Sequence, residues 1–203
     1  MIFFLLLSYQ IVILLLIVST CDALNIVIAG GSGKVGRELA TLLHNDHQVT
    51  ILCRNVFLAS TPSRVSKDFG WLGDSYLSKH KSIKLRDWDG GDLNDIVGKD
   101  WMFWQDDVLP SADMIINLVG TYTEQRTMSV ERLIRESSRL CPNVKHILVS
   151  LADEDLKMTI KKKRAADCEK ILRDNCPNSI CLRGELNNVN DICKRIVKEI
   201  NSD

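Results

Sequence analysis

Short apolar runs alternate with longer, one-sided apolar segments along the chain after residue 23. The short runs are rich in β-branched residues, which favours strands, and they span 24–29, 48–53, 82–87, 113–119, 144–150 and 179–183. The longer segments repeat apolar residues at helical spacing, which predicts helices with one buried face over 34–45, 126–140, 158–174 and 189–200. This alternation predicts a single α/β domain with a doubly wound, mainly parallel sheet of about six strands.

The start of the chain differs from the predicted domain. Residues 2–18 are apolar apart from a short polar break at 8–10, and they contain no charge. The pattern is typical of a secretory signal peptide, with Cys21-Asp22-Ala23 as a small-x-small cleavage site. An uncleaved signal-anchor is the alternative, because no Lys or Arg precedes the run and its length is near the lower limit for a membrane span.

Cleavage after Ala23 would leave Leu24 almost at the start of the first predicted strand, which favours an anchor or a short tether. We therefore expect a signal peptide or signal-anchor over 1–23 and the folded domain over 24–203. The expected location is the secretory pathway, or a membrane to which residues 2–18 tether the domain.

Composition narrows the function classes. The 203 residues are enough for one domain with a substantial core, and the 26 basic residues balance the 26 acidic ones. Without a basic face, the charge pattern indicates no nucleic-acid partner. The cysteines after residue 23 form no CxxC pair and no metal-ligand spacing, so we predict no metal site. Their apolar surroundings favour buried thiols, with the disulfides of a secreted chain as the alternative.

A glycine cluster joins the first predicted strand to the first predicted helix. Gly30 allows a sharp turn, Gly33 leaves room for a pyrophosphate, and Gly36 lets the first helical turn pack against the strand. The helix N-terminus, which includes Val35, offers free N–H groups and a positive dipole end to phosphates. Ser32 and Lys34 are candidates for further phosphate contacts. The pattern predicts a dinucleotide site, and the alternative is a glycine-rich turn of another α/β protein.

Arg54 ends the second predicted strand, where NAD-specific folds place an acidic residue on the ribose 2′-hydroxyl. An arginine has no acceptor for that hydroxyl, but its planar fork matches a 2′-phosphate. NADP(H) is therefore favoured over NAD(H) as the cofactor. The alternative is a solvated charge at the end of a strand.

Several short motifs in order resemble one family. They are the GxxGxxG loop Gly30–Gly36, Arg54-Asn55, Trp88-Asp89-Gly90 and Asn117-Leu118-Val119-Gly120. Over residues 24 to 183 the chain is similar to the atypical and extended short-chain dehydrogenase/reductases, especially the NAD-dependent epimerase/dehydratase-like branch of the NAD(P)-binding Rossmann superfamily. The resemblance implies a Rossmann fold, places Asp89 near the adenine, and places Asn117 and Gly120 near the nicotinamide-side ribose. A turn-forming amide is the alternative role of Asn117.

The resemblance is incomplete at the residues that would carry catalysis. Active reductases of this kind pair a tyrosine with a lysine four residues later on one helix, and the predicted helix 158–174 contains no tyrosine. Ser150 stands in the place of the family's substrate-holding serine. Tyr122, from the turn after the fourth strand, and Lys163, acting without tyrosine, are the candidate acid/base residues.

The end of the sequence also departs from the family. Gly184 stands where proline commonly follows the arginine of the sixth strand, and one predicted helix follows, where the family usually has a substrate-binding lobe. Three hypotheses remain open. The first is an NADP(H)-binding Rossmann protein with weak or no classical reductase activity. The second is an active NADP-dependent oxidoreductase or epimerase with non-standard acid/base residues. The third is a pseudo-enzyme scaffold that binds no nucleotide. The sequence identifies neither a small-molecule substrate nor a partner protein.

Overall fold

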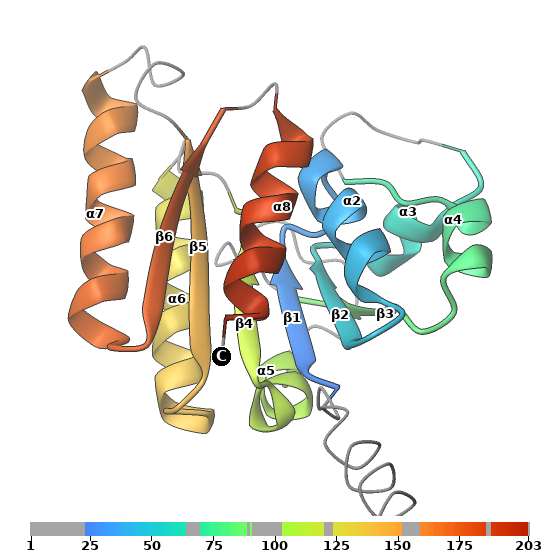
Figure 1. The fold of residues 1–203 in the computed structure, drawn as a ribbon, viewed down its shortest axis with the longest axis horizontal. Helices are drawn as coiled ribbons and strands as arrows, with labels where there is room; N and C mark the ends of the chain where they lie inside the picture. Colours follow the sequence, from blue (N-terminus) through green and yellow to red (C-terminus); the bar gives the residue numbers. More distant parts are fainter. Residues whose placement is uncertain are drawn as a thin grey trace, which may run out of the picture.

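The computed structural model describes residues 23–63, 70–88, 90, 103–119, 124–151, 159–185 and 188–202 (Figure 1). Its centre is a six-stranded sheet in the order β3-β2-β1-β4-β5-β6, with every neighbouring pair parallel. The strands are β1 (Asn25–Ala29), β2 (Gln48–Cys53), β3 (Lys84–Asp87), β4 (Met114–Asn117), β5 (Lys145–Leu151) and β6 (Ser179–Gly184). The prediction of a single, doubly wound α/β domain is confirmed.

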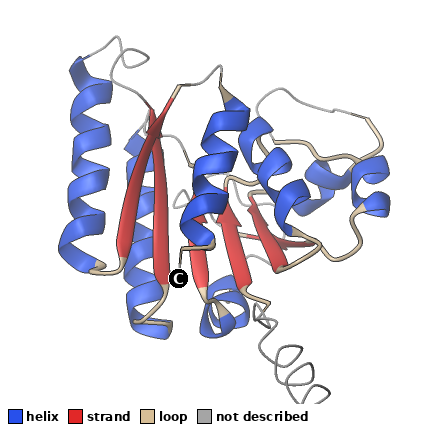
Figure 2. Cartoon of the chain, in the orientation of Figure 1, coloured by secondary structure: helices blue, strands red, loops and turns tan. Residues whose placement is uncertain are grey.

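Helices cover both faces of this sheet (Figure 2). One face carries α2 (Lys34–Leu43), α3 (Val56–Ser60), α4 (Asp74–Lys79) and α8 (Val189–Ile200). The other carries α5 (Trp104–Val108), the short 3-10 helix η2 (Leu109–Ser111), α6 (Glu124–Leu140) and α7 (Thr159–Asn175). The long helices lie within two residues of their predicted ranges.

The hydrophobic core is divided by the sheet into layers. Ile26, Ile28 and Ile51 pack under α2 and α8, whereas Val27 and Ala29 face α5 and α6. This alternation follows from the strand period of two, because successive side chains of β1 point to opposite faces. Both faces of β1 are buried, as expected for a central strand of a parallel sheet.

The order of the strands places the site. β1 lies between β2 and β4, with Ala29 paired to both Leu52 and Asn117. The chain leaves β1 toward one side of the sheet and β4 toward the other, so the crossover connections diverge at their carboxyl ends. In open parallel sheets, ligands bind at this topological switch point.

The described residues do not test the predicted leader. Residues 1–22 lie outside them, and none of the described helices is long and apolar enough to cross a membrane. The six cysteines after residue 23 are free thiols, and all but Cys181 are buried. Burial accounts for the raised thiol pKa of Cys53, about 12, and of Cys141, Cys168 and Cys193, each about 11.

Candidate functional site

The glycine loop turns directly out of β1 at the switch point. Gly30 has a φ of +74°, a left-handed conformation that favours glycine. A Cβ on Gly30 would lie 3.1 Å from the carbonyl carbon of Leu118 and from the backbone nitrogen of Val119. The loop therefore touches the turn that follows β4, and both the backbone conformation and this contact exclude a side chain at Gly30.

Gly33 and Gly36 differ in their surroundings. A Cβ on Gly36 would lie 2.3 Å from the Cα of Gly31, so the first turn of α2 packs directly on the loop. A Cβ on Gly33 would come no closer than 3.4 Å to the Gly30 oxygen, an ordinary contact. The space in front of Gly33 is therefore open, as a bound pyrophosphate requires.

The N-terminus of α2 is electrostatically prepared for an anion. Gly33 is its N-cap residue, no side chain caps it, and the first turn contains no acidic residue. The first helical hydrogen bond runs from the Arg37 N–H to the Gly33 oxygen at 2.9 Å, so the preceding N–H groups lie before the helical ladder. With the positive end of the helix dipole, these groups fit a pyrophosphate.

Ser32 lies inside a small contact cluster beside the loop. A Cβ on Gly70 would lie 2.0 Å from the Ser32 Oγ, so Gly70 covers this side chain closely. The Ser32 hydroxyl also lies near the Cys53 thiol and lowers the thiol pKa against the larger effect of burial. The phosphate contact predicted for Ser32 stays a prediction, and the same holds for exposed Lys34.

The end of β2 is fixed by its neighbours. The Asn55 side chain caps α3 by accepting a hydrogen bond from the Leu58 N–H at 2.8 Å. The Val56 N–H donates to the Asp87 carboxylate at 2.6 Å, which joins α3 to β3. Arg54 is exposed, and its Cγ lies 3.2 Å from the position of a Cβ on Gly90. Arg54 thus follows the end of β2 at the surface, where the adenine ribose is expected, and its contact with a 2′-phosphate stays a prediction.

Of the other predicted cofactor and catalytic residues, the structure describes some and leaves others outside the described ranges. Asn117 is buried, and its Oδ1 accepts a hydrogen bond from the Val119 N–H at 3.0 Å, as a turn-forming amide does. Its place near the ribose stays a prediction. Asp89, Gly120 and Tyr122 lie outside the described residues.

Ser150 is buried at the end of β5. It is 3% exposed, and its Oγ has no hydrogen-bond partner among the residues that the structure describes. It shares a sheet face with Leu148, which packs against α6 and α7. Lys163 is an exposed side chain of α7 and forms no hydrogen bond to this hydroxyl. The structure therefore does not join these two predicted catalytic residues.

No family model matches the chain, and no curated protein sequence matches it. Solved structures do. A putative short-chain dehydrogenase/reductase from Corynebacterium glutamicum is 15% identical, with a TM-score of 0.54 over 88% of this chain and 92% of that one. NmrA, a negative transcriptional regulator solved with NADP, is 13% identical, with a TM-score of 0.56 over 80% and 45%. A UDP-N-acetylglucosamine 4-epimerase from Methanobrevibacter ruminantium, solved with UDP-N-acetylmuramic acid, is 15% identical, with a TM-score of 0.53 over 79% and 54%.

The chain has a Rossmann fold like that of these epimerase-like and short-chain dehydrogenase/reductase structures. This Rossmann domain spans about half the length of the epimerase and of NmrA. At such low identity the likeness concerns the fold, and the activities of those proteins are not thereby transferred to this one.

The Rossmann domain also contains an ion pair with one buried member, which sequence reasoning missed. Glu169 is 4% exposed, and both its carboxylate oxygens accept hydrogen bonds from the Arg183 guanidinium, at 3.0 and 2.9 Å. Arg183 is the strand partner of Ser150, so the pair lies beside that serine. No local sequence pattern marks this pair, because its two members come from separate elements, α7 and β6.

The departure at Gly184 has a packing explanation in this Rossmann domain. A Cβ on Gly184 would lie 2.4 Å from the Cγ1 of Ile192. Helix α8 thus returns over the end of β6, and a side chain at this position would force the Ile192 side chain to move.

Two tryptophans, from the end of β3 and the start of α5, pack against each other. Trp88 follows β3, and its ring meets that of Trp104 at 5.5 Å with an interplanar angle of 88°. Both side chains are buried, and the Trp104 Nε1 has no hydrogen-bond partner among the described residues. The edge-to-face geometry is one that aromatic pairs prefer. This pair provides an intrinsic fluorescence signal close to the expected nucleotide.

Proposed function

We propose that this protein is an NADP(H)-binding Rossmann protein with weak or no classical reductase activity. The observation that carries the proposal is the contrast within the glycine loop. Gly30 and Gly36 are closed in by protein atoms, whereas Gly33 faces open space at an uncapped helix N-terminus. Such an arrangement favours a phosphate group as the missing neighbour.

The preference for NADP(H) rests on Arg54. Its position at the carboxyl end of β2 is the one next to the adenine ribose in Rossmann folds. Arg54 is exposed, and the planar fork of a guanidinium suits a 2′-phosphate. The resemblance to NmrA, solved with NADP, is compatible with this preference but does not decide it.

Titration with both cofactors tests the proposal. We expect saturable NADPH binding, followed by tryptophan fluorescence and calorimetry, and weaker NADH binding. Arg54→Glu should weaken NADPH binding by about 10- to 100-fold, because a charge-assisted contact is lost. The same variant should weaken NADH binding far less. Arg135→Glu, the same charge change on exposed α6, is the matched control. An equal loss of affinity for both cofactors in Arg54→Glu would refute the 2′-phosphate role. If the wild type bound neither cofactor, only the hypothesis of a nucleotide-free scaffold would remain.

The weak or absent reductase activity follows from α7, whose sequence lacks the tyrosine that would act as acid/base. A bound cofactor would supply hydride chemistry in this site. The glycine loop Gly30–Gly36 would hold the cofactor. Ser150 favours the second candidate function, an active oxidoreductase or epimerase. A buried hydroxyl without a protein partner costs free energy unless a ligand satisfies it.

Turnover assays separate the two candidates. NADPH oxidation is followed with aldehydes, ketones and nucleotide sugars, in the wild type, in Ser150→Ala and in the control Ser78→Ala on α4. We expect no turnover above background in any of them. Turnover that disappears in Ser150→Ala alone would replace the binding-only function with catalysis.

The secretory or membrane-anchored location is a separate proposal. It rests on the apolar, uncharged character of residues 2–18. Mass spectrometry of the N-terminus of the protein from cells tests the form: a chain that starts at Leu24 supports a cleaved signal peptide, and an intact Met1 excludes one.

A further inference from the structure

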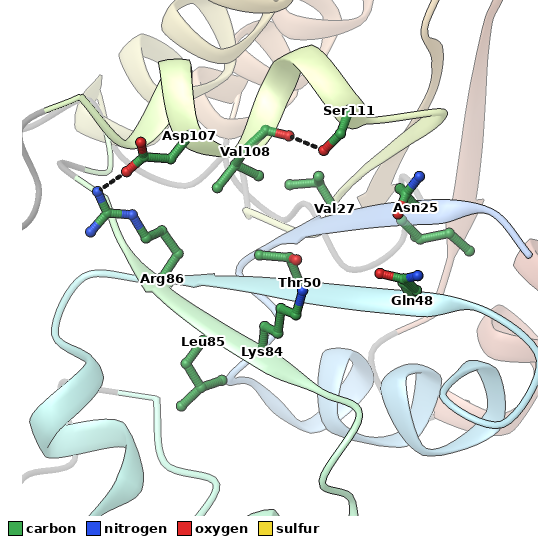
Figure 3. A pocket seen from close by; sticks show the side chains of 11 residues that line it. Asn25, Val27, Gln48, Thr50, Lys84, Leu85, Arg86, Asp107, Val108 and Ser111 are labelled. Carbon is green, nitrogen blue, oxygen red and sulfur yellow. Dashed lines mark hydrogen bonds and ion pairs between the residues drawn. The ribbon is translucent and has the colours of Figure 1, made fainter.

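A groove of about 340 Å³ lies on the sheet away from the glycine loop (Figure 3). Its floor is the amino-terminal half of β1, β2 and β3, and α5 and η2 form its roof. The dinucleotide site lies at the carboxyl ends of the same strands, so the two sites are at opposite ends of the sheet. The volume is within the range of small-ligand sites.

The floor of the groove is polar, unlike the rest of the sheet. On the α2 face, β2 contributes the buried residues Val49 and Ile51. On the groove face, the alternate positions are Gln48 and Thr50, and β3 adds Lys84. Parallel sheets are normally apolar on both faces because helices cover them. These polar positions therefore indicate a surface that meets water or a polar ligand.

The groove contains two basic side chains, and only one of them forms an ion pair within the described part of the chain. Arg86 forms an ion pair with Asp107 of α5, as Figure 3 shows. Lys84 has no ion pair within the described part of the chain. Lys84 is the strand partner of Thr50, so its ammonium and the threonine hydroxyl rise from adjacent positions of the floor. An ammonium beside neutral hydrogen-bonding groups favours an anionic oxygen group.

The same groove also has apolar walls. Val27 comes from β1 and Val108 from α5, and in Figure 3 both side chains border the cavity above Thr50. A site with apolar walls and a few convergent polar groups is typical of small organic ligands. A fully hydrated inorganic anion would gain little from the valines.

We propose that this groove binds a small organic carboxylate. Its carboxylate contacts Lys84, with Thr50 and Gln48 as hydrogen-bonding neighbours, and its compact apolar body lies between Val27 and Val108. Because the groove is at the amino end of the sheet, binding there is independent of NADP(H).

Benzoate is the probe, because it combines a carboxylate with a compact apolar ring. Binding is followed by chemical shifts of the backbone amides of the full domain, with and without NADPH. We expect saturable shifts at Thr50 and Lys84 with a Kd in the millimolar range, as befits so small a ligand. Benzamide, which lacks the charge, and inorganic phosphate, which lacks the apolar body, should bind at least several-fold more weakly.

Lys84→Gln should weaken benzoate binding by about tenfold, because it removes a charge-assisted hydrogen bond. Lys79→Gln, the same change on exposed α4, should leave it unchanged. Shifts that map to the glycine loop, equal binding of benzamide, or equal loss in both lysine variants would each overturn the proposal. Since benzoate should bind whether or not NADPH does, failure of the nucleotide proposal would not be mistaken for failure of this one.

Discussion

Single glycines in the loop differ in whether the fold requires them. Gly36 is required by the protein itself, because α2 and the loop leave no room for a Cβ. The fold does not require a glycine at position 33, because the φ of −77° and ψ of 177° suit any residue and the surroundings of Gly33 are open. A glycine that the fold does not require points to something outside the polypeptide, and this makes the pair a direct test of the site.

We predict opposite effects for Gly33→Ala and Gly36→Ala. Gly36→Ala forces a methyl group into the Gly31 backbone and should lower the free energy of unfolding by roughly 1–3 kcal/mol or more. Gly33→Ala should change stability by only a few tenths of a kcal/mol, as expected at an N-cap, yet strongly weaken NADPH binding. Chemical denaturation and calorimetry measure the two quantities. A Gly33→Ala protein that binds NADPH normally would contradict the open-cradle interpretation.

Among elements, α7 and β6 are joined by the Glu169–Arg183 pair. The Glu169 side chain is 6% exposed, whereas that of Arg183 is 45% exposed. The two parallel N–H···O contacts fix the rotation of α7 over the sheet and therefore the surroundings of Ser150. Removing one partner leaves the other with fewer contacts, most severely the buried Glu169 carboxylate, whose other ion pair is with Arg173 at 3.8 Å.

Glu169→Ala should lower the free energy of unfolding by roughly 2–3 kcal/mol, less than for a fully buried pair because Arg183 reaches solvent. The double variant Glu169→Ala/Arg183→Leu should recover part of that loss. Asp106→Asn, which breaks the exposed pair with Arg139 at 3.4 Å, should cost less than about 1 kcal/mol. A double-mutant cycle from urea denaturation measures the coupling; strictly additive single effects would show that the pair contributes nothing specific.

The sequence predicted the elements whose signals are local. The strands, the long helices and the glycine loop each repeat a recognisable pattern within a dozen residues or so. The segment 56–81 has no such period, and its two short helices are held by distant partners, such as the Tyr76 hydroxyl donating to the Arg37 oxygen. The Glu169–Arg183 pair, the hydrogen bond of Asn117 and the groove at Lys84 likewise depend on how separate elements meet, which no local pattern encodes.

For the whole molecule, the sheet and its helices bury few ionisable groups, and His146 is the one with the largest consequence for pH. It is 2% exposed on β5, and its Nε2 lies 2.9 Å from the Ser137 hydroxyl of α6. That hydroxyl donates to the Ile134 oxygen at 3.0 Å, so the imidazole Nε2–H is the donor to Ser137. A neutral histidine thus links the α6 layer to the sheet, and burial lowers its pKa to about 4.

Folding should therefore weaken as the pH falls from about 6.5 to about 4. Within that window the unfolded chain binds a proton at His146 and the native chain does not, so stability is complete above the unfolded pKa and declines as the pH falls through the folded pKa. The full effect is roughly 3 kcal/mol, from a shift of about 2.5 pKa units.

Urea denaturation across this range, in the wild type and in His146→Gln, isolates the contribution of His146 to the free energy of unfolding, because the carboxylates titrate alike in both. The wild type should lose stability relative to the variant as the solution becomes acidic, with the difference levelling off below about pH 4. A difference that stays constant over the whole range would mean that the folded and unfolded chains protonate His146 alike, and would contradict a lowered pKa in the folded domain.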